Sequence, residues 1–334
     1  MTWRQRWQAP VLVLAVLLIG WLAFAEYSRL SSPTAEVYRV VVLSDIHLPV
    51  RPEVKDTERQ QKIIAAKNKV RADVNSWDDV WRVAVIGDLV AGFGTDKERE
   101  YAAGYFSQYR KPLAIVLGNH DYIYEDSLSR FGTRVRGDAA LRAEKIRKFR
   151  DAFHLPKVYY SQKAGQYLLI FLSVDSLDSG QLTQMSEEQL NWLRQELAAN
   201  TGRPTIIFFH APLKGTLTNY RESINTPDFV AQPDKALAEI LRQHPQVFLW
   251  VSGHTHTAAT QNDFAAPVNA WEGRIMNIHN ADMDRETIWT NSLYLYPDKV
   301  VIRTFDHAQD RWLDGLERTI ALPALPKRFW PWQR

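Results

Sequence analysis

The sequence has no cysteine, which excludes disulfide bonds, cysteine-ligated zinc and iron–sulfur clusters. Any metal ion must therefore be held by histidine, asparagine or carboxylate side chains. The chain also lacks a large excess of charge of one sign, because 41 basic and 38 acidic residues give a formal charge of +3. Nucleic-acid binding is consequently not expected.

Internal repeats and low-complexity segments are absent too, and 46% of the 334 residues are hydrophobic. This composition excludes general disorder and suffices for one large α/β domain or two smaller ones.

An uncharged, largely aliphatic segment, Trp7–Ala25, lies near the N-terminus behind Arg4 and Arg6. At about 1.5 Å per residue, a helix of this length approaches the ~30 Å thickness of a bilayer core. The alternative is a signal peptide, since Ala23–Ala25 fits a small-residue cleavage site. We favour an uncleaved anchor. In both cases the positive-inside rule predicts that the rest of the chain is extracytoplasmic, and the membrane is the expected partner of this segment.

The remaining chain divides into a linker, a large domain and a tail. We predict an N-terminal segment at 1–27, a linker at 28–36, the domain at 37–320 and a tail rich in proline and aromatic residues at 321–334. Within the domain, residues 122–157 form a charged insertion that is expected to be helical.

Apolar runs alternate with helical patterns through the domain, which predicts an α/β fold with a covered sheet. The predicted strands are Val37–Ser44, Val83–Ile86, Leu113–Leu117, Gln166–Val174, Thr205–Phe209 and Val247–Val251, and the predicted helices are Thr57–Val74, Asp96–Tyr109 and Lys235–Gln243. Ser186 followed by Gln189 predicts a capped helix that buries Leu190, Leu193 and Leu197. Three late segments, Arg274–Ile278, Ser292–Tyr296 and Lys299–Phe305, are expected to complete a second sheet.

Polar motifs follow the predicted strands at their carboxyl ends, where open α/β sheets build their sites. In chain order they read D-x-H, G-D, G-N-H-D, H and G-H-x-H, and their candidate metal ligands are Asp45, His47, Asp88, Asn119, His210, His254 and His256. Alternate residues of an extended segment point to opposite sides, so D-x-H and H-x-H require a turn, for which Pro49 and Gly253 are candidates.

These oxygen and imidazole donors suit manganese, iron, zinc, cobalt or nickel. They are too many for one ion. Two divalent ions about 3.5–4 Å apart, sharing a carboxylate, would use them all and leave room for a bridging hydroxide to attack phosphorus in line.

The five motifs together resemble those of the calcineurin-like metallophosphoesterases, and the resemblance covers roughly Val37–Phe305. The compact form of the motifs is most similar to the branch that includes bacterial cyclic-nucleotide phosphodiesterases. The resemblance implies a four-layer α/β/β/α sandwich with two central mixed sheets. It also implies hydrolysis of phosphomonoesters or phosphodiesters at two metal ions. One ion would bind Asp45, His47 and His256, the other would bind Asn119, His210 and His254, and Asp88 would bridge them.

The resemblance gives His120 a different role, because it implies that this residue contacts the phosphoryl group and assists the leaving group. Asn119 is expected beside the substrate as well. Asp121 is a candidate carboxylate partner for His120, with a turn-capping role as the alternative. Asp175 could support the site from behind or be an ordinary loop carboxylate.

The second motif lacks the aspartate and arginine that protein phosphatases of this superfamily carry after G-D, so phosphoproteins are not the expected substrates. A small phosphate ester, a nucleotide or a phospholipid-type substrate remains. The basic stretch 129–150 is either a lid that attracts anionic substrates or a solvated helix face. The alternative function is a weakly active or inactive module that binds phosphorylated ligands at the cell envelope.

Overall fold

The computed structural model describes residues 36–217 and 222–325. The predicted N-terminal helix, Trp7–Ala25, lies outside these ranges, so its role and the predicted location of the domain stay predictions. Within the two described ranges, no helix combines the length and the apolarity that crossing a membrane requires.

Two mixed sheets form the centre of the domain. The first contains seven strands in the order β14 (Arg311–Trp312), β13 (Lys299–Asp306), β12 (Trp289–Leu295), β1 (Tyr38–Leu43), β2 (Val80–Ile86) and β3 (Leu113–Val116), with β15 (Arg318–Ala321) also paired to β13. The second contains six strands in the order β10 (Ala270–Trp271), β11 (Ile275–His279), β9 (Val247–Ser252), β8 (Thr205–Phe208), β7 (Tyr167–Phe171) and β6 (Tyr160–Ala164). Both combine parallel and antiparallel pairs. The α/β prediction with mixed sheets is therefore confirmed.

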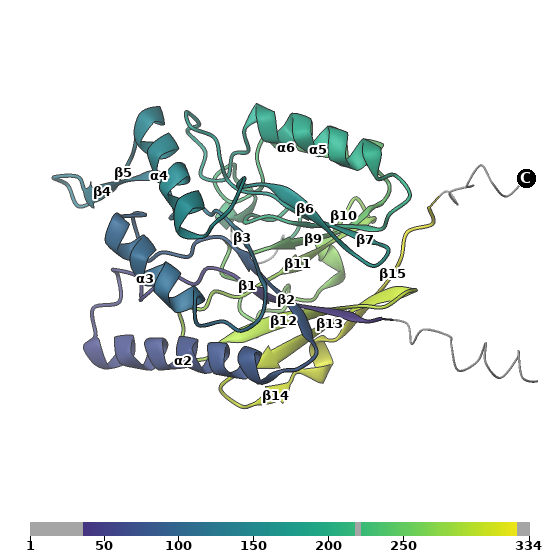
Figure 1. Cartoon of the computed structure of the whole chain (residues 1–334), viewed down its shortest axis with the longest axis horizontal. Helices are drawn as coiled ribbons and strands as arrows, with labels where there is room; N and C mark the ends of the chain where they lie inside the picture. The colour runs from purple at the N-terminus through teal and green to yellow at the C-terminus, as the bar shows by residue number, and fades with distance from the viewer. Residues whose placement is uncertain (1–35, 218–221, 326–334) are drawn as a thin grey trace, which may run out of the picture. The chain divides into compact units, whose positions relative to one another are not determined.

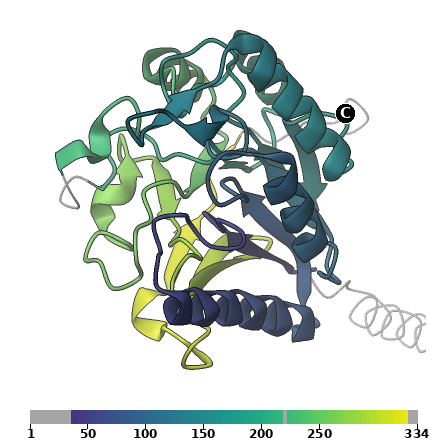
Figure 2. The same cartoon turned by 90° about the vertical axis from the view of Figure 1, so that its left-hand side faces the viewer.

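Helices lie on the outer sides of the sheets, as Figure 1 shows with α5 and α6 above and α2 below. The helices of the described residues are α2 (Thr57–Ser76), α3 (Asp96–Phe106), α4 (Ala139–Ala152), α5 (Glu187–Ala199) and α6 (Asp234–Gln243), with short 3₁₀ turns η1 (Glu222–Asn225), η2 (Pro267–Asn269) and η3 (Asp314–Leu316). In Figure 2, α2 is the purple helix along the lower edge of the domain.

Successive residues of β1 enter different hydrophobic clusters. Val40 and Val42 pack between the two sheets, whereas Val41 and Leu43 pack under the helices. This two-sided burial explains why the strands read as continuous apolar runs. The predicted cap of α5 is also present, because the Ser186 hydroxyl accepts a hydrogen bond from the Gln189 backbone at 3.2 Å.

The prediction for the late strands was wrong in part. β11 does join the second sheet beside β9, but β12 and β13 extend the first sheet through antiparallel pairing of β12 with β1. β2 and β3 lie on one side of β1, so the other edge of β1 is open to a further strand. β12 pairs with this edge.

The charged insertion is not helical throughout, which corrects the prediction for its first half. It begins with a hairpin of β4 (Tyr124–Leu128) and β5 (Arg134–Arg136), and only then forms α4. Two of its basic residues are buried, because Arg142 donates to the carbonyls of Gly137 and Ser179, and Lys145 donates to those of Phe93 and Tyr124. For these two residues, a solvated helix face is the wrong description.

Candidate metal centre

The candidate ligands lie where strands from both sheets end. Asp45 and His47 follow β1, Asp88 follows β2, and Asn119 follows β3 in the first sheet. His210 follows β8, while His254 and His256 follow β9 in the second sheet. The carboxyl ends of these parallel strands therefore deliver polar side chains from both layers to one place.

The backbone at the ligands themselves turns the chain. The φ angles are positive at Asp45 (49°), His47 (49°), Asp88 (52°), His254 (65°) and His256 (51°). This left-handed conformation is uncommon for residues with a side chain, and it gives D-x-H and H-x-H their turns. The prediction that Pro49 and Gly253 supply these turns was therefore wrong.

Gly253 serves a different purpose, which is close packing. A β-carbon at this position would lie 1.7 Å from the Ser44 hydroxyl oxygen and 2.3 Å from a carboxylate oxygen of Asp45. Glycine is required here because the loop that carries His254 passes directly over the loop that carries Asp45.

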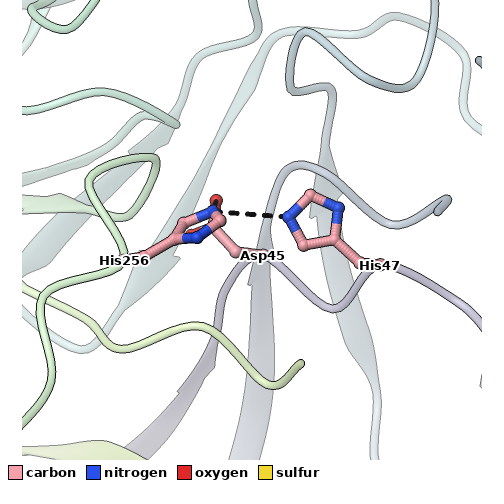
Figure 3. A group of neighbouring side chains, drawn as sticks. All are labelled: Asp45, His47 and His256. Atoms are coloured by element: carbon pink, nitrogen blue, oxygen red, sulfur yellow. Dashed lines mark hydrogen bonds and ion pairs between the residues drawn. The ribbon is translucent and has the colours of Figure 1, made fainter. Parts of the chain in front are cut away.

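The first ligand cluster contains Asp45, His47 and His256. Nε2 of His256 lies 3.1 Å from Oδ1 of Asp45 and 3.3 Å from Nε2 of His47. Figure 3 shows the two imidazole rings with nitrogens facing one another beside the carboxylate. Asp45 and His47 are fully buried, whereas the His256 side chain is 24% exposed, so this cluster opens to solvent at His256.

The second cluster contains Asp88, His210 and His254, with Asn119 beside it. Nε2 of His210 lies 3.3 Å from Oδ2 of Asp88, 3.2 Å from Oδ1 of Asn119 and 3.1 Å from Nδ1 of His254. Oδ2 of Asp88 is also 4.0 Å from Nε2 of His47 in the first cluster. Asp88 therefore lies between the clusters.

This arrangement fits metal ions better than a hydrogen-bond network. Atoms held about 2.1 Å from one ion lie roughly 3.0–3.4 Å apart in tetrahedral or octahedral geometry, and the separations within each cluster run from 3.1 to 3.3 Å. Oδ1 of Asp45 is buried and faces Nε2 of His256 at 3.1 Å. A cation at each cluster would satisfy that oxygen and the facing nitrogens.

Backbone carbonyls orient three of the histidine rings. Nδ1 of His47 lies 3.3 Å from the Val90 carbonyl, Nδ1 of His210 lies 2.9 Å from that of Ile86, and Nε2 of His254 lies 2.8 Å from that of Asp228. A carbonyl can only accept, so each of these nitrogens carries the proton and the opposite nitrogen presents a lone pair to the site. That is the tautomer a metal ligand needs.

The electrostatics of the second cluster are dominated by Asp88. Burial alone would lower the pKa of His210, but the Asp88 charge outweighs it and raises this pKa to about 9. Although burial opposes the change, the charge of His210 lowers the pKa of Asp88 well below its usual range. Burial and the charge of His210 lower the pKa of His254 to about 4. The carboxylate thus stays ionised, and the site attracts positive charge.

His120 lies at the edge of both clusters and is partly exposed. Its ring is 5.0 Å from that of His47, and its backbone N–H donates to Oδ1 of Asp88 at 2.8 Å. Its Nδ1 lies 2.9 Å from the Gly92 carbonyl, which leaves Nε2 for the substrate side.

Asp121 connects loops. Its carboxylate accepts backbone hydrogen bonds from Leu89 (2.8 Å), Val90 (3.2 Å) and Gly118 (2.8 Å), and so ties the loop after β2 to the loop after β3. The His120 ring contacts the carbonyl of Gly92 through Nδ1, and the Asp121 carboxylate is occupied by the backbone instead. This geometry favours the capping alternative for Asp121.

Asp175 lies outside both clusters. It accepts from the backbone and hydroxyl of Ser186 and from the Gln189 side chain at the start of α5. Asp175 therefore has a structural role, which agrees with its interpretation as an ordinary loop carboxylate.

Sequence reasoning missed the charged residues behind the first cluster. Lys67 of α2 is buried and donates to the carbonyls of His47 and Pro49 and to Asp284 at 2.7 Å. Arg51 donates to Asp284 at 2.8 Å and lies 3.2 Å from Nδ1 of His256. No sequence pattern predicts that a lysine in the middle of a helix is buried. The available signal was the pair of acidic residues on either side of Met283, Asp282 and Asp284, of which Asp284 binds Lys67.

The fold and the donor set define an α/β protein whose histidine and aspartate groups could hold metal ions between two sheets. Residues 38–258 match the model of the calcineurin-like phosphoesterase family. The chain belongs to this family, and the family prediction is confirmed.

Two curated relatives match part of the chain. A protein of Fibrobacter succinogenes named probable cyclic nucleotide phosphodiesterase is 27% identical over 178 residues, which cover 53% of this chain and 58% of the relative. The uncharacterized protein YvnB of Bacillus subtilis is 24% identical over 156 residues, which cover 46% of this chain and 10% of the relative. The matches thus span less than two thirds of either relative.

Solved structures share the fold. A dimetal phosphatase from Danio rerio superposes with a TM-score of 0.53 at 14% identity, covering 85% of this chain and 99% of the other. The purple acid phosphatase PPD1 from yellow lupin (Lupinus luteus) seeds gives 0.53 at 14% identity, covering 86% and 54%. GAP50, the anchor in the inner membrane complex of Plasmodium, gives 0.52 at 13% identity, covering 87% and 90%.

Proposed function

We propose that the chain is a dinuclear metal phosphoesterase that hydrolyses phosphomonoester or phosphodiester bonds. The observation that carries this proposal is the convergence of two ligand clusters on Asp88, with donor separations that suit two neighbouring ions. A single structural histidine or aspartate would not need this arrangement.

Each cluster supplies one ion with ligands. Asp45, His47 and His256 would hold one, His210, His254 and Asn119 would hold the other, and Asp88 would contact both. When bound, two such ions supply Lewis-acid charge for the phosphoryl oxygens and lower the pKa of water at the site. The buried carboxylates Asp45 and Asp88 offset this positive charge.

His120 serves the leaving group in this proposal. The Gly92 carbonyl accepts the proton of Nδ1, so Nε2 faces the phosphoryl or ester oxygen and donates to it when the ring is doubly protonated. The ring is partly exposed beside Asp88 and His47, where a phosphoryl group bound between the clusters would meet it.

The proposed substrate is a small phosphate ester, a nucleotide or a phospholipid-type ester. The short motif Gly87-Asp88-Leu89-Val90 argues against phosphoproteins. The relative named as a probable cyclic nucleotide phosphodiesterase supports phosphodiesters among the substrates to be tested.

The test uses the purified full chain loaded with manganese and assayed on p-nitrophenyl phosphate and bis(p-nitrophenyl) phosphate. Asp88→Asn and His210→Ala are expected to abolish turnover and to lower the bound metal measured by mass spectrometry. His244→Ala, at the end of α6 and outside both clusters, is the matched control and should keep both. Full activity in the cluster variants, or a wild-type protein that binds no metal, would refute the proposal. An inactive wild type that binds phosphate would favour the binding module.

A further inference from the structure

The β4–β5 hairpin stands next to the candidate metal centre. Its first residue, Tyr124, places its ring 5.4 Å from that of His120, and its hydroxyl lies 3.5 Å from Nδ2 of Asn119. Figure 1 shows the hairpin projecting beside α4. The hairpin therefore borders the space that a substrate at His120 would occupy.

A cavity of about 600 Å³ lies between this hairpin and the loops that follow β1 and β2. This volume suits a small organic ligand. Its lining includes Glu53, Lys55, Phe93, Tyr124, Arg134 and Arg136. Tyr124 lines this cavity and also contacts His120 and Asn119, so the cavity borders the metal centre.

Positive charge predominates in the lining, because Lys55, Arg134 and Arg136 face a single carboxylate, that of Glu53. Arg134 holds Glu53 through Nη2 at 2.6 Å, and its guanidinium carbon lies 5.8 Å from the ring centroids of both Phe93 and Tyr124. These contacts fix the guanidinium against two aromatic walls.

Arg134 lines the cavity with a side chain that is 27% exposed. A guanidinium has five N–H donors, and the contact with Glu53 uses Nη2, so other donors of this group are available to a ligand in the cavity. Arg136, on the same strand, lies 3.5 Å from Asp228, whose backbone carbonyl contacts His254.

We propose that this cavity binds the organic group of the phosphoester, that the group carries a second negative charge, a phosphate or carboxylate, and that Arg134 determines this specificity. The inference rests on the proposed function, since it concerns the substrate of the same site. The scissile phosphoryl group lies at His120, and the second anion lies against Arg134 between Phe93 and Tyr124.

The competing explanation is that Arg134 only pairs with Glu53 and binds no substrate. The two explanations predict different effects of the substitution Glu53→Gln. If the ion pair is purely structural, Glu53→Gln and Arg134→Gln harm the protein alike. If Arg134 binds substrate, removing the Glu53 carboxylate frees the guanidinium, and Glu53→Gln lowers the KM for doubly charged esters.

The experiment compares matched substrates on the manganese-loaded full chain. One pair is phenyl phosphate and 4-carboxyphenyl phosphate, and the other is adenosine 5′-monophosphate and adenosine 3′,5′-bisphosphate. Phosphatidic acid and phosphatidylglycerol phosphate in mixed micelles form a lipid pair that separates a headgroup from a soluble ester as the source. The wild type is expected to prefer the doubly charged member of at least one pair.

Arg134→Gln is expected to raise the KM for that member by about tenfold and to affect the singly charged member less, because a hydrogen bond between charged groups is lost. Arg134→Lys should recover part of the loss. Arg147→Gln, an exposed arginine of α4 paired to Asp151, is the control and should match the wild type. Equal losses on both members of a pair, or a rise in KM for Glu53→Gln, would overturn the proposal.

A binding measurement separates this inference from the proposed function. Phenylphosphonate and 4-carboxyphenylphosphonate are titrated calorimetrically into the same proteins. If the wild type hydrolyses nothing but binds the carboxylated phosphonate more tightly through Arg134, the proposed function fails and the inference stands. If hydrolysis is observed without any preference for a second charge in either assay, the inference fails alone.

Discussion

Asp121 offers a sharp test, because a structural role for its carboxylate predicts a loss of stability when it is removed, whereas a catalytic role predicts unchanged stability and a lower kcat. Asp121→Ala removes the acceptor of three backbone N–H groups and leaves these donors buried. Each unsatisfied buried donor costs about 1–3 kcal/mol. Relief from burying a charge offsets part of this cost, since burial and the charge of Asp88 raise the pKa of Asp121 to about 7. A net loss of about 3 kcal/mol is expected.

Urea unfolding of the metal-loaded protein, followed by tryptophan fluorescence, measures this loss, which corresponds to a melting temperature lower by about 6 °C. Asp121→Asn keeps one oxygen for Leu89 and Val90 but turns an N–H₂ group toward the Gly118 N–H, so it should fall between the alanine variant and the wild type. The control is Asp138→Ala, an exposed cap of α4 with one hydrogen bond, which should cost about 1 kcal/mol. Unchanged stability together with a lost kcat would refute the structural role and return Asp121 to catalysis.

Three further predictions concern groups around the site. Burial and then the charge of Arg318 lower the pKa of His279 to about 3. The contribution of His279 to stability is therefore complete above the unfolded pKa of about 6.5 and is lost as the pH falls toward 3, with about 2 kcal/mol lost by pH 5. Between pH 8 and pH 5, the free energy of unfolding in urea should fall by about 2 kcal/mol less in His279→Gln than in the wild type. An equal fall in both proteins would contradict the argument. Lys67→Met should cost about 3 kcal/mol, at the low end for breaking a buried ion pair, because Asp284 loses one of its two cations and keeps Arg51; Lys67→Met with Asp284→Asn should recover part of this, and no recovery would count against the ion pair. Chelation should lower the melting temperature, since ligand at a hundred times its Kd stabilises by about 2.7 kcal/mol; Asp88→Asn should be insensitive to the chelator, and an insensitive wild type would contradict metal binding.

The sequence alone predicted the strands that carry the motifs because both faces of these strands are buried. Val40–Leu43, for example, is predicted to be a strand without knowledge of the strands that pair with it. The sheet membership of β12 and β13 was not predictable in the same way. Pairing of β12 with β1 joins Tyr38 to Leu295, far along the chain, and no local pattern specifies such a partner.

The candidate site was predictable as a set of residues but not as a geometry. Strand ends bring the ligands together, and this follows from the order of the motifs. The turn at D-x-H arises from the left-handed backbone of Asp45 and His47, a conformation that is uncommon for residues with a side chain and that the motif itself does not predict. Lys67 escaped prediction for a related reason, since its partner Asp284 is remote in sequence. Arg134 lies in the basic stretch 129–150 that was predicted as a possible lid, but its pairing with the distant Glu53 was not predictable.

The left-handed backbone at five ligand positions also bears on how this protein could be engineered. A residue with a side chain costs roughly 1–2 kcal/mol in this conformation relative to glycine, which adopts it freely. Without metal, His256→Gly removes such a cost at a residue with φ near 50°. Selection for heat resistance in metal-free medium would therefore favour substitutions that erase the ligands. Thermostabilised variants of this chain should be selected with metal present and screened for turnover at every round.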